Sequence, residues 1–267
     1  MDLGLAGRSC LVTGASSGIG RQSALMLCAE GADGLLVARG EERLRAAAEE
    51  AASTGGGRAE ALALDVTAAD AGARMLAAAA ERFGALDVLV NNAGTASWRD
   101  LEDVPEEDWR LQYELNVMAP LRAMRAAIPP MAERGWGRVV NVCSTAGKRP
   151  SAAMAEYSVA KAAELSLSRL FADRYASAGV LVNAVAPGPV EAEMWMEPGG
   201  LLDQSRELSG AASREEALAA AGAKRPIGRL AGPEEIAATI VFLCSERASY
   251  VAGAAWSVDG GTVQVII

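Results

Sequence analysis

A tyrosine and a lysine stand four residues apart in the segment Tyr157-Ser158-Val159-Ala160-Lys161. On a helix this spacing places both side chains on one face, about one turn apart. A tyrosine with a pKa near ~10 is a poor acid or base at neutral pH, but an adjacent ammonium favours the phenolate. Ser144 follows a predicted strand, where ligands meet a parallel sheet. Together these side chains predict a proton-transfer site, although a Tyr-Lys pair alone would equally suit a solvated helix surface.

A glycine-rich turn, TGASSGIG, follows the first predicted strand and carries Gly14, Gly18 and Gly20. Glycines let the backbone approach a pyrophosphate, and the helix that follows offers unpaired N–H groups and a partial positive charge. The spacing Gly-x3-Gly-x-Gly differs from the usual G-x-G-x-x-G, so a glycine turn without a ligand is the alternative. Its place between the first strand and the first helix favours a dinucleotide site.

The same turn contains Gly14-Ala15-Ser16-Ser17-Gly18, which also matches the nucleophile elbow of a serine hydrolase. Such a serine needs a base, ordinarily histidine, and the chain has no histidine. A hydrolase is therefore disfavoured. The commonest zinc ligand is missing for the same reason, and the four cysteines show no CxxC pairing, so we expect neither a metal site nor a disulfide framework.

Ala38-Arg39 follows the second predicted strand, where an NAD site carries an acid for the ribose 2'-hydroxyl. Here there is no acid, and a guanidinium is available to pair with a 2'-phosphate. NADP(H) is therefore favoured over NAD(H). The alternative is a solvated arginine at the start of a helix.

The elements that must position these residues follow from hydrophobic periodicity. The predicted strands are Ser9 to Thr13, Leu35 to Ala38, Ala61 to Leu64, Val88 to Val90, Val139 to Cys143, Leu181 to Val185 and Ala255 to Val258. The predicted helices include Ala24 to Ala29, Glu41 to Ala52, Ala71 to Phe83, Glu106 to Met131 and Ala155 to Ala176. Capping boxes are predicted at Thr67 with Asp70 and Ser213 with Glu216, and a helix start at Pro233.

Strands alternating with helices predict an α/β fold: a single doubly wound, Rossmann-type parallel sheet with helices on both faces. We expect residues 1–267 to form one dinucleotide-binding and catalytic domain. Residues 189–224 break the alternation with Pro, Gly, Met and Trp mixed with a polar helix. A simple crossover needs fewer residues, so we expect a substrate lid there.

Composition excludes several classes of protein. The net charge of −9 disfavours nucleic acid as a partner, and no segment has the length and apolarity of a membrane span or export signal. We therefore expect a cytoplasmic protein. The chain ends in the apolar segment Val263 to Ile267, which predicts coverage by a partner subunit in a homo-oligomer.

Taken together, TGASSGIG, Asn91-Asn92-Ala93-Gly94, Asn116, Ser144, Tyr157-Ser158-Val159-Ala160-Lys161 and Pro187-Gly188 resemble the short-chain dehydrogenase/reductase family in order and spacing. The resemblance covers almost the entire chain. It implies that Tyr157 is the proton donor or acceptor, Ser144 hydrogen-bonds the substrate oxygen, Lys161 holds the nicotinamide ribose, and Asn116 orders a proton-relay water.

The expected cofactor contacts combine this resemblance with Arg39. They are Gly14, Ser16, Ser17, Gly18, Ile19, Gly20, Arg39, Asp65, Val66, Asn92, Ala93, Gly94, Tyr157, Lys161, Pro187, Gly188 and Val190. For Asp65 and Asn92 a local role, capping a turn or bonding nearby backbone, stays open. Expected substrate contacts are Ser144, Met194 and Trp195, though these last two with Met196 could equally pack the lid onto the body.

Within the family the chain is similar to the 3-oxoacyl-acyl-carrier-protein reductase group. This implies an NADP(H)-dependent ketoreductase that acts on a small-molecule or carrier-bound carbonyl and forms a homotetramer. Arg39 favours reduction over oxidation as the direction of the reaction. Many ketone, sugar and steroid reductases share the pattern, so an NAD-dependent alcohol dehydrogenase of the same family is an alternative. A non-catalytic cofactor-sensing protein or a scaffold would be expected to lack the tyrosine, the lysine or cofactor affinity.

Overall fold

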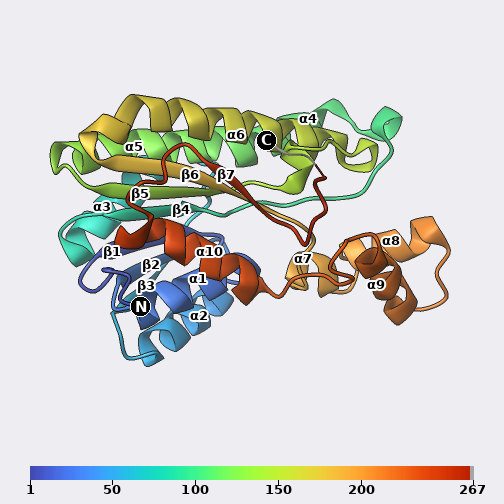
Figure 1. Ribbon diagram of the computed structural model, residues 1–267, viewed down its shortest axis with the longest axis horizontal. Coiled ribbons are helices and arrows are strands. Elements are labelled where there is room, and N and C mark those ends of the chain that lie inside the picture. Colours follow the sequence, from blue (N-terminus) through green and yellow to red (C-terminus); the bar gives the residue numbers. More distant parts are fainter. Residues whose placement is uncertain (265–267) are drawn as a thin grey trace.

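The computed structural model describes residues 1–264 and contains a parallel sheet of seven strands in the order β3-β2-β1-β4-β5-β6-β7 (Figure 1). The strands are β1 (Ser9–Thr13), β2 (Asp33–Ala38), β3 (Ala59–Ala63), β4 (Val88–Asn91), β5 (Gly137–Val142), β6 (Val180–Pro187) and β7 (Ala255–Val258). Each predicted strand overlaps one of these. The strand order reverses between β1 and β4, which marks the switch point of a doubly wound sheet and confirms the predicted fold class.

Helices cover both faces of the sheet. They are α1 (Gly18–Ala29), α2 (Glu41–Ser53), α3 (Ala71–Phe83), α4 (Glu106–Tyr113), α5 (Ala119–Glu133), α6 (Ala155–Tyr175), α7 (Glu193–Met196), α8 (Leu201–Ser209), α9 (Arg214–Ala223) and α10 (Pro233–Cys244). In Figure 1, α1, α2 and α10 lie on one side of the strands, and α3, α5 and α6 on the other. Within residues 1–264, no helix is long and apolar enough to cross a membrane.

The inner strand β1 shows why the core has two halves. Successive side chains of a strand point to opposite faces, and Cys10 and Val12 pack toward α1, α2 and α10, whereas Leu11 packs toward α3, α5 and α6. All three side chains are almost fully buried. A strand buried on both faces reads as a continuous apolar run, which is the pattern that identified these strands in the sequence.

The predicted helix from Glu106 to Met131 is found as three consecutive segments. Between α4 and α5, residues Glu114–Met118 form a single π-helical segment, η2. A π segment accommodates an extra residue in the helix and occurs frequently at functional sites. Asn116 lies in the middle of η2, so the irregularity coincides with a predicted site residue.

Residues 189–224 form three short helices instead of the one polar helix expected. In Figure 1, α8 and α9 extend beyond the end of the sheet. The segment has its own apolar cluster, in which Trp195, Leu201 and Leu202 pack with residues of α9. Arg43 of α2 ties it to the body, because its guanidinium pairs with Glu193 at 3.6 Å and with Glu197 at 3.0 Å.

Two local predictions have different outcomes. The capping box of Thr67 with Asp70 is wrong: α3 has no side-chain cap, and the Thr67 hydroxyl donates to Asp65 Oδ1 at 2.7 Å. Half of the predicted capping box at Ser213 is found: Ser213 Oγ accepts from the Glu216 N–H at 3.1 Å, but the Glu216 carboxylate accepts from the Ala212 N–H, at 2.8 Å, and not from that of Ser213. Of the apolar tail predicted to contact a partner subunit, residues 265–267 lie outside the described residues.

Candidate active site

A cavity of about 1080 Å³ lies at the carboxyl ends of the strands. Most of the predicted site residues line it: Gly14, Ser16, Ser17, Gly18, Ile19, Arg39, Asp65, Val66, Asn92, Ala93, Gly94, Ser144, Tyr157, Lys161, Pro187, Gly188, Val190, Met194 and Trp195. Gly20 and Asn116 do not line it. Parallel strands bring their carboxyl ends to one edge, so segments far apart in the sequence meet there.

The glycine turn needs glycine for two separate reasons. Gly14 and Gly18 have φ values of +65° and +51°, a conformation that side chains with a Cβ rarely adopt. Gly20 is packed instead: a Cβ there would lie 2.3 Å from Asn92 Nδ2 and 2.4 Å from the Gly14 carbonyl oxygen. Gly20 therefore permits close contact between α1 and the end of β1, although its own atoms do not line the cavity.

Asn92 holds the turn in place. Its side-chain amide donates to the carbonyl oxygens of Thr13 at 2.9 Å and Gly14 at 3.3 Å. The backbone N–H groups of Asn92 and Ala93 both donate to Thr13 Oγ1, at 2.9 and 3.1 Å. These bonds join the ends of β1 and β4 across the switch point. The local alternative for Asn92, in which its amide bonds nearby backbone, is therefore found, and the residue also lines the cavity.

The two residues expected at the adenosine end lie together. Arg39 is exposed, follows β2 directly and lines the cavity. Asp65 follows β3, and hydrogen bonds from the backbone N–H and the hydroxyl of Thr67 hold the pKa of its carboxyl below the usual value; the charge of Arg39 contributes less. Asp65 thus caps the local turn, as the alternative interpretation expects, and it also lines the cavity.

Tyr157 and Ser144 face each other from two elements. Ser144 follows β5 and is held as the N-cap of the short helix η3 (Thr145–Gly147), where its Oγ accepts from the Ala146 N–H at 3.1 Å. Burial raises the pKa of Tyr157, and the Lys161 ammonium and the Ser144 hydroxyl lower it. The net pKa is above the ordinary tyrosine value, because burial is the largest of these effects and Glu164 and Cys143 add to it.

Lys161 is more constrained than the sequence indicates. Its Nζ lies 5.7 Å from the centroid of the Tyr157 ring and donates to the Val142 carbonyl at 2.9 Å. A second N–H donates to Glu164 Oε2 at 2.8 Å. Glu164 was not among the predicted site residues. The available signal was its position three residues after Lys161, which puts both on one face of α6.

Asn116, in η2, lies near Lys161, with Gly94 bordering both side chains. Its Nδ2 donates to the carbonyl oxygen and to Oε1 of Gln112, at 3.0 and 2.7 Å, which fixes the orientation of the amide. Its Oδ1 is buried without a hydrogen-bond partner among the described residues. A Cβ built on Gly94 would lie 3.3 Å from this Oδ1 and 3.8 Å from Lys161 Nζ, so Gly94 borders both groups.

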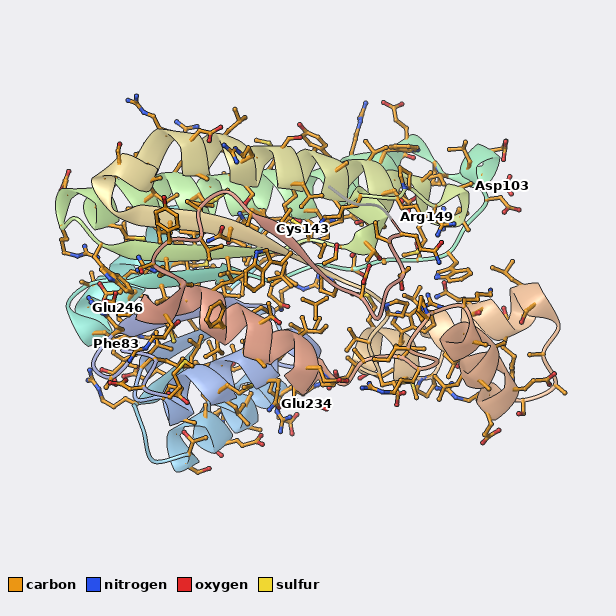
Figure 2. All side chains as sticks on the ribbon, viewed as in Figure 1. Phe83, Asp103, Cys143, Arg149, Glu234 and Glu246 are labelled. Atoms are coloured by element: carbon orange, nitrogen blue, oxygen red, sulfur yellow. The ribbon has the colours of Figure 1, made fainter. Side chains whose placement is uncertain are left out.

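The substrate end of the cavity is largely apolar and includes residues that sequence reasoning missed. Trp98 and Trp195 pack edge to face with ring centroids 6.3 Å apart, and Leu111, Leu115, Met154 and Leu201 line the cavity with them. Trp195 is buried, and Met194 is exposed. Arg149 is a further cavity residue; Figure 2 shows it toward the end of the molecule that carries α8 and α9, with Cys143 nearer the centre. Trp98 lies in a loop without periodicity, so no pattern identified it.

Comparisons with known proteins agree with this geometry. The family model described as short chain dehydrogenase matches residues 8–199. The cis-4-hydroxycyclohexanecarboxylate dehydrogenase of Sinomonas cyclohexanicum is 38% identical over 99% of this chain and 100% of its own. The 3-oxoacyl-[acyl-carrier-protein] reductase of Vibrio cholerae is 34% identical over 98% of this chain and 100% of its own.

Among solved structures, L-sorbose reductase from Gluconobacter frateurii, complexed with NADPH and L-sorbose, superposes with a TM-score of 0.92 at 34% identity. The superposition covers 100% of both chains. The match to the family model and the similarity along the whole length agree with the sheet order, the glycine turn and the Ser144, Tyr157 and Lys161 arrangement. The chain belongs to the short-chain dehydrogenase/reductase family of oxidoreductases.

Proposed function

We propose that this protein is an NADP(H)-dependent ketoreductase, which interconverts a carbonyl compound and its secondary alcohol. The observation that carries the proposal is that Ser144, Tyr157 and Lys161 line one cavity with the glycine turn and Arg39. A proton-transfer group, a hydrogen-bonding hydroxyl and a dinucleotide-type turn within one cavity are what hydride transfer to a carbonyl requires.

The residues present fit a nicotinamide dinucleotide. The positive φ of Gly14 and Gly18 exposes backbone at the start of α1, where N–H groups suit a pyrophosphate. Arg39 supports NADP(H), because its guanidinium is suited to a 2'-phosphate and the preceding residue is the uncharged Ala38. The bound cofactor would supply the hydride in reduction or accept it in oxidation.

The side chains around the cavity supply the proton chemistry. Ser144 donates a hydrogen bond to the substrate oxygen, and Tyr157 transfers its hydroxyl proton to the same oxygen as hydride reaches the carbon. The C=O π bond breaks, new C–H and O–H bonds form, and Tyr157 is left as the phenolate. Lys161 has three N–H donors, of which two bind Val142 and Glu164, so the third is available to the nicotinamide ribose.

Asn116 completes the proton path in this proposal. Its buried Oδ1 has no partner within residues 1–264 and borders Gly94 beside Lys161. A buried acceptor of this kind costs stability unless a donor reaches it, and water is the smallest such donor. We assign to this oxygen a water that returns a proton to Tyr157 after reduction.

The substrate of the proposed reaction is a ketone with an apolar portion that packs against the cavity wall formed by Trp98 and Trp195. Relatives named as a hydroxycyclohexanecarboxylate dehydrogenase and as an acyl-carrier-protein reductase are compatible with such a pocket and support either a free or a carrier-bound carbonyl. The test is NADPH and NADH oxidation against a panel of cyclic, linear and thioester-linked ketones. Turnover with NADH alone would favour an NAD-dependent alcohol dehydrogenase, and binding without any turnover would favour a cofactor sensor.

We also propose a homo-oligomer, with a tetramer as the expected form. Val159 and Leu170 are 53% and 66% exposed and lie about three turns apart, on one face of α6. Two apolar side chains on the outer surface of the longest helix support coverage by another subunit.

A further inference from the structure

Lys161 and Glu164 form a buried ion pair beneath the cavity. Lys161 Nζ lies 2.8 Å from Glu164 Oε2, and the two side chains are 3% and 2% exposed. Burying one charge without a partner costs several kcal/mol, so such a carboxylate is retained only where an opposite charge compensates it. The pair lies within α6 at i and i+3, so the helix itself brings the two side chains to one face.

The pair acts directly on the proposed proton donor. Burial is the largest single effect and lowers the pKa of Lys161, but Glu164, Tyr157 and Cys143 together outweigh it, with Glu164 first among them, so the pKa of the ammonium is raised. Burial raises the pKa of Glu164, and the ammonium opposes that change. With Nζ at hydrogen-bond distance, we take the pair as ionised at neutral pH. The carboxylate then raises the pKa of Tyr157, against the effect of Lys161.

Few other ionisable groups act on Tyr157. Cys143, at the end of β5, raises the pKa of Tyr157, and its own thiol pKa is raised by burial and by Glu164. Lys148, which follows η3, acts on Cys143 and not directly on the phenol. On the side of η2, Glu114 is already paired with Arg122. Glu164 is thus the carboxylate with a direct effect on the Tyr157–Lys161 pair.

Resting on the function proposed above, we propose that Glu164 is a positioning residue: it holds the Lys161 ammonium against the Val142 carbonyl and offsets its charge, so that Tyr157 stays protonated as reduction requires. Reduction consumes the phenol proton, whereas oxidation needs the phenolate as base. A carboxylate that disfavours the phenolate biases the site toward reduction at neutral pH. Without Glu164, the full charge of Lys161 would act on the phenol.

The test removes the charge of Glu164 and keeps the shape of its side chain. In Glu164→Gln, the amide oxygen still accepts from Lys161 but carries no charge, so the phenolate is stabilised. The rise of kcat/KM for alcohol oxidation with pH is expected to move to lower pH by about one unit. Tyrosinate absorbance near 295 nm, taken as the difference between each protein and its Tyr157→Phe counterpart, should shift in the same direction without any cofactor.

Glu164→Asp and Glu156→Gln are the accompanying variants. Aspartate keeps the charge one methylene farther from Lys161, so a smaller shift in the same direction is expected; it also supplies the test if Glu164→Gln does not fold. Glu156 is a buried carboxylate on the same helix, 2% exposed, and does not contribute to the pKa of Tyr157. Its glutamine variant should leave the profile unchanged.

Outcomes separate this inference from the proposed function. If both Glu164 variants keep the wild-type pH profile and tyrosinate titration while Tyr157→Phe is inactive, Glu164 has only a structural role and the inference is wrong. An equal shift in Glu156→Gln would overturn it as well, by showing a general effect of buried carboxylates. If Tyr157→Phe keeps full activity, it is the proposed function that fails, whatever Glu164 does.

Discussion

Lys161 Nζ lies 5.7 Å from the centre of the Tyr157 ring, and the same ammonium is bound to Val142 and Glu164. The lysine is therefore fixed before any ligand arrives, and its distance to the phenol is set by α6 and by the end of β5. A preorganised ammonium loses little conformational freedom when it binds a ribose.

Tyr157→Phe should abolish turnover and leave cofactor affinity nearly unchanged, because only the hydroxyl takes part in proton transfer. General acid catalysis contributes about 10²- to 10⁴-fold, so kcat should fall by at least two orders of magnitude. Steady-state kinetics and a fluorescence titration with NADPH measure the two quantities. Tyr113→Phe is the control, since Tyr113 is 48% exposed on α4 and does not line the cavity. Retention of more than a small fraction of wild-type kcat would remove Tyr157 from the reaction.

Gly20→Ala should weaken cofactor binding and lower the melting temperature, although Gly20 does not face the cavity. The added Cβ would lie 2.3 Å from Asn92 Nδ2 and must displace the amide that holds the glycine turn. Overpacking of this kind costs roughly 1–3 kcal/mol of folding free energy. The matched control is Gly40→Ala, because a Cβ at Gly40 meets no atom within 4 Å. Equal thermal unfolding curves for the two variants would contradict the packing role.

Trp195→Ala tests whether the aromatic pair contacts substrate or only packs the lid. If Trp195 contacts the ligand, KM for an apolar ketone should rise roughly tenfold, as expected for the loss of about 1.4 kcal/mol of binding free energy. NADPH affinity should change little. Leu202→Ala is the packing control: Leu202 is 1% exposed in the same apolar cluster and does not line the cavity. A similar rise in KM for both variants would mean that Trp195 acts through packing alone.

The strands and the catalytic spacing were predictable because each depends on local pattern. Buried parallel strands read as apolar runs, and Tyr157 and Lys161 share a helix face whatever surrounds them. The π segment at Glu114–Met118 was not predictable, since one extra residue in a helix leaves the apolar pattern on either side intact. Likewise, the capping pattern predicted a pairing of Thr67 with Asp70, whereas in the structure the Thr67 hydroxyl donates to Asp65.

The missed site residues share a different cause. Glu164 looks like an ordinary helix-surface acid in the sequence, and its significance comes from burial at 2% exposure, a property of the tertiary packing. Trp98 and Arg149 reach the cavity from loops, where no period indicates which way a side chain points. Motif spacing therefore predicted the groups that we propose meet the cofactor, and the packed structure was needed to find those that surround them.

Leu170→Glu should weaken assembly. Leu170 is 66% exposed on the outer face of α6, and a charge there would face the apolar surface of another subunit. Light scattering of the wild type is expected to give a mass well above the 27.5 kDa of one chain, and the variant a smaller one. Leu208→Glu, a leucine 63% exposed on α8, is the control and should leave the mass unchanged. A wild-type protein that is monomeric would contradict both the proposed oligomer and the role of this face.

Cofactor choice rests on Ala38 and Arg39, which stand where an NAD site carries its ribose acid. With a guanidinium at the cavity and no carboxylate at position 38, NADPH should bind more tightly than NADH. Hydrogen bonds to a charged group contribute roughly 1.5 to 3 kcal/mol, which corresponds to a preference of about tenfold to a hundredfold. Fluorescence titrations with each reduced cofactor measure it.

The double variant Ala38→Asp with Arg39→Leu should reverse the order, because it removes the attraction for the 2'-phosphate and adds a carboxylate that repels it. Arg45→Leu is the control: Arg45 is exposed on α2, pairs with Glu41 at 3.4 Å and does not line the cavity, so the preference should persist. A wild type that prefers NADH would show that Arg39 is only a solvated residue at the start of α2. The loss of the preference in Arg45→Leu would instead mean that the general positive charge of α2, and not the position of Arg39, selects the phosphate.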